Sequence, residues 1–182
     1  MSEILEPIEK DLEAFWTHAV IAAKLYPASA YAGQDDITSL RPAAFAFGAT
    51  REEADELAQM VVDGKKTATS GIVKEYLSEG EPLPVKGDMA IVADGRGIPR
   101  ALIRNTRVEI TPFAEVGDAV ALAEGEGDLE HWREVHEAFF AEHIPSFAQG
   151  SDGEARMVVT EFFEVLYADH GAANRSSAGV TN

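Results

Sequence analysis

The spacing of the apolar residues changes near residue 64, and this change restricts the chain to folds that mix helices with strands. Before it, Thr50 to Glu53 is a capping box, in which a hydroxyl and a carboxylate can satisfy the first helical amides. An apolar stripe with helical spacing follows, and Gly64 can adopt the left-handed conformation that ends a helix. The sequence therefore predicts a helix between Thr50 and Gly64.

Beyond Gly64 the pattern is typical of strands. Residues 87–93 form a short apolar run, residues 94–97 have turn chemistry, and residues 98–110 are rich in β-branched side chains, which together predict a hairpin. Residues 157–167 are rich in Val, Phe and Tyr and predict a long closing strand. Helical spacing predicts two further helices, over residues 7–26 and 128–142. Trp132 and Phe139 of the second are expected in the core.

These elements, in this order, predict an α+β domain whose sheet can curl into a small β-barrel with flanking helices. With 182 residues, of which 46% are hydrophobic, the chain can bury one core and is too short for two ordinary domains. We expect an N-terminal helix and irregular extension over residues 1–43 and the main domain over residues 44–167. The small and polar residues 168–182 predict a disordered tail.

Composition excludes several classes of function. The chain has no cysteine, so disulfides, thiolate nucleophiles and cysteine-bound zinc are impossible. No long apolar run is present and the N-terminus is acidic, which predicts a cytoplasmic protein with no membrane partner. A net charge of -17 argues against a protein that binds nucleic acid with its whole surface, because such binding requires Lys and Arg to neutralise phosphates.

Basic residues are concentrated between Gly64 and Arg107, where they outnumber acidic ones. This window is either an ordinary solvated surface or a basic-lined pocket within an acidic body. A pocket of that kind would suit a nucleoside or a short anionic ligand better than a long duplex.

The densest group of reactive side chains directly follows the predicted helix end. It offers two amines and three hydroxyls, from Lys65, Lys66, Thr67, Thr69 and Ser70. A structural explanation is available, because lysines complement the negative end of a helix dipole and threonines favour a following strand. The segment lacks the glycines of a Walker-type phosphate loop.

A second group places three acids between glycines, at Glu124, Glu126 and Asp128, immediately before the predicted helix. Acidic residues are favoured at a helix N-terminus, with Asp128 as the N-cap, but glycines also permit close approach of a ligand. His131 and His136 are five residues apart, a poor helical match for the paired ligands of zinc enzymes. We therefore expect no metal and no other cofactor.

An ordered set of short motifs resembles the ASCH family, whose fold is PUA-like, between about residues 44 and 167. Some ASCH proteins have an arginine after the Lys-Thr motif, where this chain has Ser70 and Gly71. The matching segments are Phe45–Gly48, Gly64–Thr69, Pro82–Asp88, Ala123–Asp128, Trp132 and Arg133 with His136, and Phe162–Tyr167.

The resemblance implies chemistry on nucleosides or RNA. Small bacterial ASCH members are amidohydrolases of N4-acylated cytidines that use a lysine, a threonine and a glutamate, which fall here on Lys66, Thr69 and Glu126. Some members resembling this longer type are linked to ribonuclease activity, and a non-catalytic domain of a regulatory complex is a third interpretation. We expect an amidohydrolase with a small nucleoside substrate, or alternatively an RNA-binding or RNA-cleaving protein. Substrate contacts are expected from Lys65, Thr67, Ser70, Glu124 and Arg133.

Two catalytic mechanisms fit these residue types. Thr69 can attack the acyl carbon while Lys66 takes its proton, which requires a neutral amine, and Glu126 returns a proton to the leaving nitrogen. In the second mechanism, a water molecule attacks the acyl carbon while Lys66 and Thr69 hold the carbonyl oxygen. Lys66 and Thr69 would face opposite sides of a regular strand, so their convergence requires a turn or bulge near Thr67 and Ala68. We nevertheless predict that Lys66, Thr69 and Glu126 share one pocket.

Overall fold

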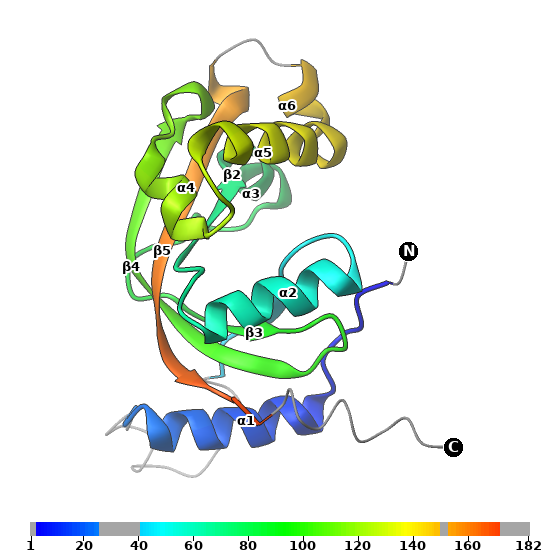
Figure 1. The fold of residues 1–182 in the computed structure, drawn as a ribbon, viewed down its shortest axis with the longest axis vertical. Coiled ribbons are helices and arrows are strands. Elements are labelled where there is room, and N and C mark those ends of the chain that lie inside the picture. Colours follow the sequence, from blue (N-terminus) through cyan, green and yellow to red (C-terminus); the bar gives the residue numbers. More distant parts are fainter. Residues whose placement is uncertain (1–2, 26–40, 150–152, 172–182) are drawn as a thin grey trace. The chain divides into compact units, whose positions relative to one another are not determined.

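The structure is a computed structural model that describes residues 3–25, 41–149 and 153–171. Figure 1 shows its helices and strands along the chain. They are α1 (Glu9–Ala22), β1 (Ala44–Ala46), α2 (Arg51–Val62), β2 (Ala68–Ile72), α3 (Val73–Glu79), β3 (Met89–Ala93), β4 (Pro99–Pro112), the 3-10 turn η2 (Phe113–Glu115), α4 (Asp118–Glu124), α5 (Leu129–His143), α6 (Pro145–Gln149), the 3-10 turn η3 (Glu154–Arg156) and β5 (Met157–Ala168).

The strands form one mixed sheet in the order β1-β3-β4-β5-β2. β1 runs parallel to β3, whereas the β3–β4 hairpin and the β2–β5 pair are antiparallel. The predicted hairpin and closing strand are confirmed, and the combination of this sheet with six α-helices confirms the α+β class. β2 lies at an edge of the sheet and pairs with β5 through the register Thr69 to Glu161 and Ser70 to Thr160.

The described residues form two compact units. The first comprises the chain up to Gly64, residues 89–104 and the chain from Val165 onward; the second comprises residues 65–88 and 105–164. β4 and β5 contribute residues to both. Each unit has its own apolar cluster.

In the first unit, α1 contributes one apolar side to the core. Four of its residues pack with Ile91 of β3 and Leu102 of β4; they are Leu12, Phe15, Trp16 and Ala19. The predicted capping box of α2 is present, since the Glu53 amide donates to Thr50 Oγ1 and the Thr50 amide donates to Glu53 Oε2, both at 3.2 Å. Gly64 has a φ of 73°, as a left-handed residue after a helix end requires.

In the second unit, α5 covers a cluster of aromatic and aliphatic residues. Asp128 is its N-cap, as predicted, and Oδ1 of that residue accepts from the His131 amide at 2.9 Å. Trp132 is fully buried, which confirms its predicted place in the core. The same prediction is wrong for Phe139, whose exposed fraction is 40%. The buried side of α5 is centred on His136 and includes Phe140, so Phe139 lies at its margin.

The short helices α3 and α4 were not predicted, because seven residues carry too little periodicity. Most of the predicted irregular connection after Pro27, and residues 172–182 of the predicted tail, lie outside the described residues. Among the helices of the described part, none is long and apolar enough to cross a membrane.

The burial of α5 predicts a large difference between two adjacent aromatic residues. Phe140→Ala should lower the free energy of unfolding by about 3–5 kcal/mol, because it leaves a cavity in the core. Phe139→Ala should cost about 1 kcal/mol or less, since that ring is partly solvated. Urea unfolding of both variants measures the difference, and equal losses would contradict this account of α5.

Candidate active site

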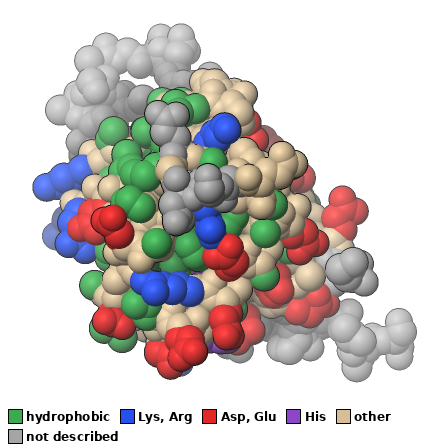
Figure 2. Space-filling view, turned by 90° about the horizontal axis from the view of Figure 1, so that it is seen from above, with side chains coloured by type: hydrophobic (Ala, Val, Ile, Leu, Met, Phe, Trp, Pro, Cys, Tyr) green, Lys and Arg blue, Asp and Glu red, His purple; other side chains and the backbone are tan. Residues whose placement is uncertain are grey.

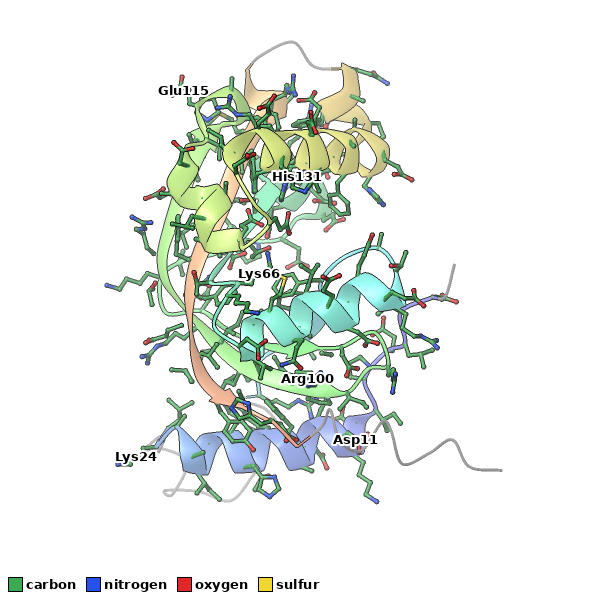
Figure 3. All side chains as sticks on the ribbon, viewed as in Figure 1. Asp11, Lys24, Lys66, Arg100, Glu115 and His131 are labelled. Carbon is green, nitrogen blue, oxygen red and sulfur yellow. The ribbon has the colours of Figure 1, made fainter. Side chains whose placement is uncertain are left out.

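The candidate site lies in the second unit and draws its side chains from three segments. Lys66 lies just before β2 (Figure 3) and Ser70 lies in β2. Glu124 ends α4 and Glu126 follows it, while α5 supplies Trp132 and His136. Gly125, with a φ of 74°, ends α4 directly after Glu124, and Gly127, with a φ of 105°, precedes the cap of α5. These two conformations favour glycine, which explains why glycines alternate with the acids here.

Glu124 is the centre of the site, and it is the last residue of α4 rather than part of the start of α5. Only 1% of the residue is exposed. Its Oε1 accepts hydrogen bonds from Ser70 Oγ at 2.6 Å and from Trp132 Nε1 at 2.9 Å. Its Oε2 faces two basic nitrogens, Lys66 Nζ at 3.2 Å and His136 Nε2 at 3.4 Å. The structural explanation that Glu124 stabilises the N-terminus of the following helix is therefore wrong, because Glu124 ends the preceding helix.

The surroundings of Glu124 keep its carboxylate ionised. Burial alone raises the pKa of a carboxyl group. Here the hydrogen bond from His136, the charges of Lys66 and His136, and the hydrogen bond from Ser70 together outweigh burial and lower the pKa of Glu124 to about 2. Glu124 is thus a fixed negative charge at any ordinary pH.

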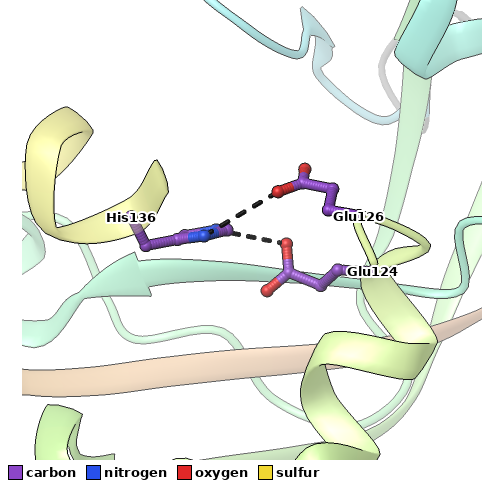
Figure 4. Close-up of side chains that lie close together, drawn as sticks. All are labelled: Glu124, Glu126 and His136. Carbon is purple, nitrogen blue, oxygen red and sulfur yellow. Dashed lines mark ion pairs between the residues drawn. The ribbon is translucent and has the colours of Figure 1, made fainter. Parts of the chain in front are cut away.

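Glu126 is held more loosely between the same two basic residues. Its Oε1 lies 3.8 Å from Lys66 Nζ and its Oε2 lies 3.8 Å from His136 Nδ1, and its side chain is 20% exposed. Figure 4 shows both carboxylates directed at the His136 ring, each joined to it by an ion pair. Of the two acids, Glu126 is therefore the one that a ligand can reach.

His136 is fixed by its neighbours on α5. Its ring stacks on the Trp132 ring with centroids 4.1 Å apart, and its Nδ1 lies 2.9 Å from the Trp132 carbonyl oxygen. Glu124, Glu126 and His136 offer potential metal-ligand atoms within 4.8 Å of one another. However, the Lys66 ammonium pairs with both carboxylates, so a metal ion would have to displace it. That no metal is needed stays a prediction.

Of the remaining residues predicted to contact substrate, two make structural hydrogen bonds and one is exposed. Thr67 fixes the start of β2 to the end of α4, since its amide and its hydroxyl both donate to the Ala123 carbonyl oxygen, at 2.6 and 3.2 Å. Arg133 Nη2 donates to the carbonyl oxygens of Ala114 and Val116, which holds the η2 turn. Lys65 is exposed. Their roles toward a substrate stay predictions.

Thr69 is directed away from the Glu124 cluster. Neighbouring strand residues face opposite sides of a sheet, and the next residue, Ser70, is the one that reaches Glu124. The cross-strand partner of Thr69 is Glu161, which accepts a hydrogen bond from Asn105 Nδ2 at 2.5 Å. Within the described residues the structure thus brings Lys66, Glu124 and Glu126 together, with Thr69 on the other face of β2.

Gly71 permits a close packing contact on that other face. A Cβ atom at this position would lie 3.3 Å from the Tyr76 ring. Tyr76 therefore occupies the space where a larger side chain at residue 71 would have to go. Burial, followed by the nearby charges of Glu161 and Glu75, raises the pKa of Tyr76 to about 12, so its phenol stays protonated.

Three residues of the cluster were not predicted as site residues: Trp132, His136 and Thr160. Trp132 and His136 are four residues apart on one helix, a spacing that could have suggested a shared polar edge. Thr160 Oγ1 lies 3.0 Å from Ser70 Oγ, and this contact depends on the β2–β5 register, for which no local signal exists.

Most of the basic window is an ordinary solvated surface, because five of its eight basic residues are exposed: Lys65, Lys74, Lys86, Arg96 and Arg107. Two of its members are buried beside carboxylates: Lys66 in the cluster above, and Arg100, in the first unit, 3.6 Å from Asp94. Acidic side chains are prominent on the face in Figure 2, as expected for a net charge of -17. These contacts favour an uncharged ligand over a phosphate at Lys66.

Comparison with known proteins identifies the class to which this fold and site belong. The model of the ASCH domain matches residues 43–167, and the chain belongs to this family. The predicted resemblance is thereby confirmed, together with its PUA-like α+β fold. A comparison with curated proteins gave no significant match.

Two solved structures cover nearly the whole chain. A protein of Enterococcus faecalis V583, described as DUF984, is 30% identical with a TM-score of 0.73 and aligns over 96% of this chain and 99% of its own. An ASCH domain from Lactobacillus crispatus JV V101 is 23% identical with a TM-score of 0.71 and aligns over 90% and 99%. The second comparison supports the fold alone.

The lowered pKa of Glu124 predicts how its variant behaves in acid. Because the folded pKa of about 2 lies below the ordinary value of 4.5, the stabilisation is complete above pH 4.5 and is lost as the pH falls toward 2. The difference in free energy of unfolding between the wild type and Glu124→Gln should therefore shrink across this window. Chemical denaturation at several pH values measures it; a difference that is constant down to pH 2 would contradict the assignment.

Proposed function

We propose that the protein hydrolyses the amide bond of N4-acylated cytidine-type nucleosides, with Lys66, Thr69 and Glu126 as the catalytic residues. The observation that carries this proposal is the buried Lys66 ammonium, paired with one fixed carboxylate and one looser carboxylate. Amide hydrolysis needs stabilisation of an oxyanion and delivery of a proton to the leaving nitrogen. A lysine and a partly exposed glutamate at one place supply both.

Lys66 serves best as a hydrogen-bond donor. Two carboxylates within 4 Å stabilise its charged ammonium form, whereas a general base would have to be neutral. A charged ammonium in a buried site stabilises the negative oxygen that develops as the acyl carbon becomes tetrahedral. We therefore assign the carbonyl oxygen of the substrate to Lys66.

Glu126 can carry the proton through the reaction. In this scheme its carboxylate takes a proton from the attacking water as the new carbon–oxygen bond forms, and it returns that proton to the exocyclic nitrogen as the carbon–nitrogen bond breaks. The products are cytidine and a carboxylic acid. Its partial exposure and looser contacts allow the movement that these two transfers require.

The role of Thr69 depends on which nucleophile attacks. The sequence suggests that Thr69 is either the nucleophile or a second residue that holds the carbonyl while water attacks. Because Thr69 lies on the other face of β2, either role requires β2 to change conformation when the substrate binds. The strand alternation that turns Thr69 toward Glu161 favours water. RNA binding or cleavage is the competing function, and the carboxylates around Lys66 oppose it because they repel phosphate.

The proposal predicts release of cytidine from N4-acetylcytidine by the purified protein, in the presence of a chelator and over a range of salt concentrations. Lys66→Ala and Glu126→Gln should each lower kcat on the order of a hundredfold or more. Lys65→Ala is the matched control, since this neighbouring lysine is exposed, and it should keep much of the activity.

The outcome that would contradict the proposal is equally specific. Acylated cytidines that stay intact at high protein concentration, while RNA is bound or cut in a Lys66-dependent and salt-sensitive manner, would establish the competing function instead.

A comparison of two adjacent hydroxyl residues identifies the nucleophile. If water attacks, Thr69→Ala should lose clearly less activity than Lys66→Ala, because only a carbonyl contact is removed. Ser70→Ala removes the adjacent hydroxyl, which contacts Glu124 on the opposite face of the strand, so this variant is a comparison and not a neutral control. Steady-state rates with N4-acetylcytidine measure all three. A loss for Thr69→Ala as large as that for Lys66→Ala would show that Thr69 is the nucleophile.

A further inference from the structure

Glu124 contacts Lys66, Ser70, Trp132 and His136, and these contacts occupy both of its carboxylate oxygens. Lys66 is buried as well, but its ammonium also pairs with the partly exposed Glu126, whereas both oxygens of Glu124 are occupied from within the protein. We propose that Glu124 is a positioning residue, which holds the Lys66 ammonium beside Glu126 and never contacts the substrate. This inference rests on the proposed function and replaces the expectation that Glu124 binds substrate.

The side chain of Lys66 needs such a partner. A lysine ammonium is a compact charge on a flexible four-carbon chain, so it is placed accurately only where another group fixes it. Glu124 Oε2 lies 3.2 Å from Lys66 Nζ, whereas Glu126 Oε1 lies at 3.8 Å. The tighter and more deeply buried contact is therefore the one that defines where the ammonium lies.

Glu124 is itself fixed from several directions. Ser70 of β2 and Trp132 of α5 both donate to Oε1, and Thr160 of β5 lies 3.0 Å from the Ser70 hydroxyl. Since the two donors to Oε1 come from β2 and α5, both outside its own helix, the carboxylate cannot rotate without breaking at least one of these hydrogen bonds. The other oxygen, Oε2, is then held toward Lys66 and His136.

By pairing with Lys66, Glu124 also leaves Glu126 available for its proposed role. If Glu124 were absent, Lys66 would have Glu126 as its remaining carboxylate partner within this cluster, and a close ion pair would restrict the movement of Glu126. With Glu124 present, the charge of Lys66 is already balanced, and Glu126 stays at the longer distance of 3.8 Å. Glu124 thus positions the Lys66 ammonium, and Glu126 takes part in the reaction.

The first test separates positioning from substrate contact. Glu124→Gln removes the charge but keeps the size of the side chain. With N4-acetylcytidine we expect kcat to fall about tenfold or more, because misplacement by about 1 Å can cost on the order of a hundredfold, while KM stays nearly unchanged. Glu130→Gln, at an exposed position of α5, is the control and should match the wild type. A rise in KM with kcat unchanged would overturn the proposal.

The second test needs no substrate. Acetylation by N-hydroxysuccinimidyl acetate, followed by peptide mass analysis, reports how accessible each lysine amine is. Lys66 should be protected in the wild type, and Glu124→Gln should increase its labelling several-fold relative to Lys65 in the same molecule. Glu137→Gln, which breaks an ion pair with Arg156 elsewhere in this unit, should leave Lys66 protected. Unchanged protection in Glu124→Gln would refute the positioning role.

Two milder variants keep the proposal testable if Glu124→Gln does not fold. Ser70→Ala and Trp132→Phe each remove one donor to Glu124 Oε1 without changing charge. Each should increase the labelling of Lys66, and protection in both would count against the proposal. A wild-type protein that hydrolyses no acylated cytidine, but whose Lys66 becomes reactive in these variants, would refute the proposed function while supporting the role of Glu124.

Discussion

The buried carboxylate of Glu124 is the constraint on which the second unit of this protein depends. A buried charge is costly unless the protein supplies opposite charges and hydrogen-bond donors. Here the donors come from β2 and α5, and the carboxylate comes from the end of α4. The same contacts that offset the cost of burial therefore tie three elements together, and they determine where the Lys66 ammonium lies.

Two glutamates, separated by a single glycine, have very different environments. Glu124 is fully buried and its pKa is lowered to about 2, whereas Glu126 is partly exposed and lies 3.8 Å from Lys66 Nζ and from His136 Nδ1. Enzymes commonly obtain different roles from two carboxyl groups by such a difference in environment. In the proposed hydrolysis, one acid stays ionised and the other moves a proton.

The parts of the fold that the sequence predicted are those with local causes. The capping box of Thr50 and the Asp128 cap depend on residues three positions apart, and both were found. Placing Glu124 correctly required knowledge of α4, a helix too short to recognise by period. The contact between Ser70 and Thr160 depends on strand register, and register is set by tertiary packing. The resemblance to the ASCH family predicted that Lys66 and Glu126 lie together, as they do. The sequence analysis also predicted that Thr69 joins them, and strand alternation explains why it faces the other way.

A crystal structure of Glu126→Gln with N4-acetylcytidine bound would show directly which group of the substrate contacts Lys66. This variant removes the proposed proton carrier but leaves Glu124 and Lys66 in place, so the substrate should persist. The account predicts the acyl carbonyl oxygen at about 3 Å from Lys66 Nζ, with the exocyclic nitrogen facing residue 126. A nucleoside that binds elsewhere, or a Lys66 amine that contacts only Glu124 while the ligand is bound, would contradict it.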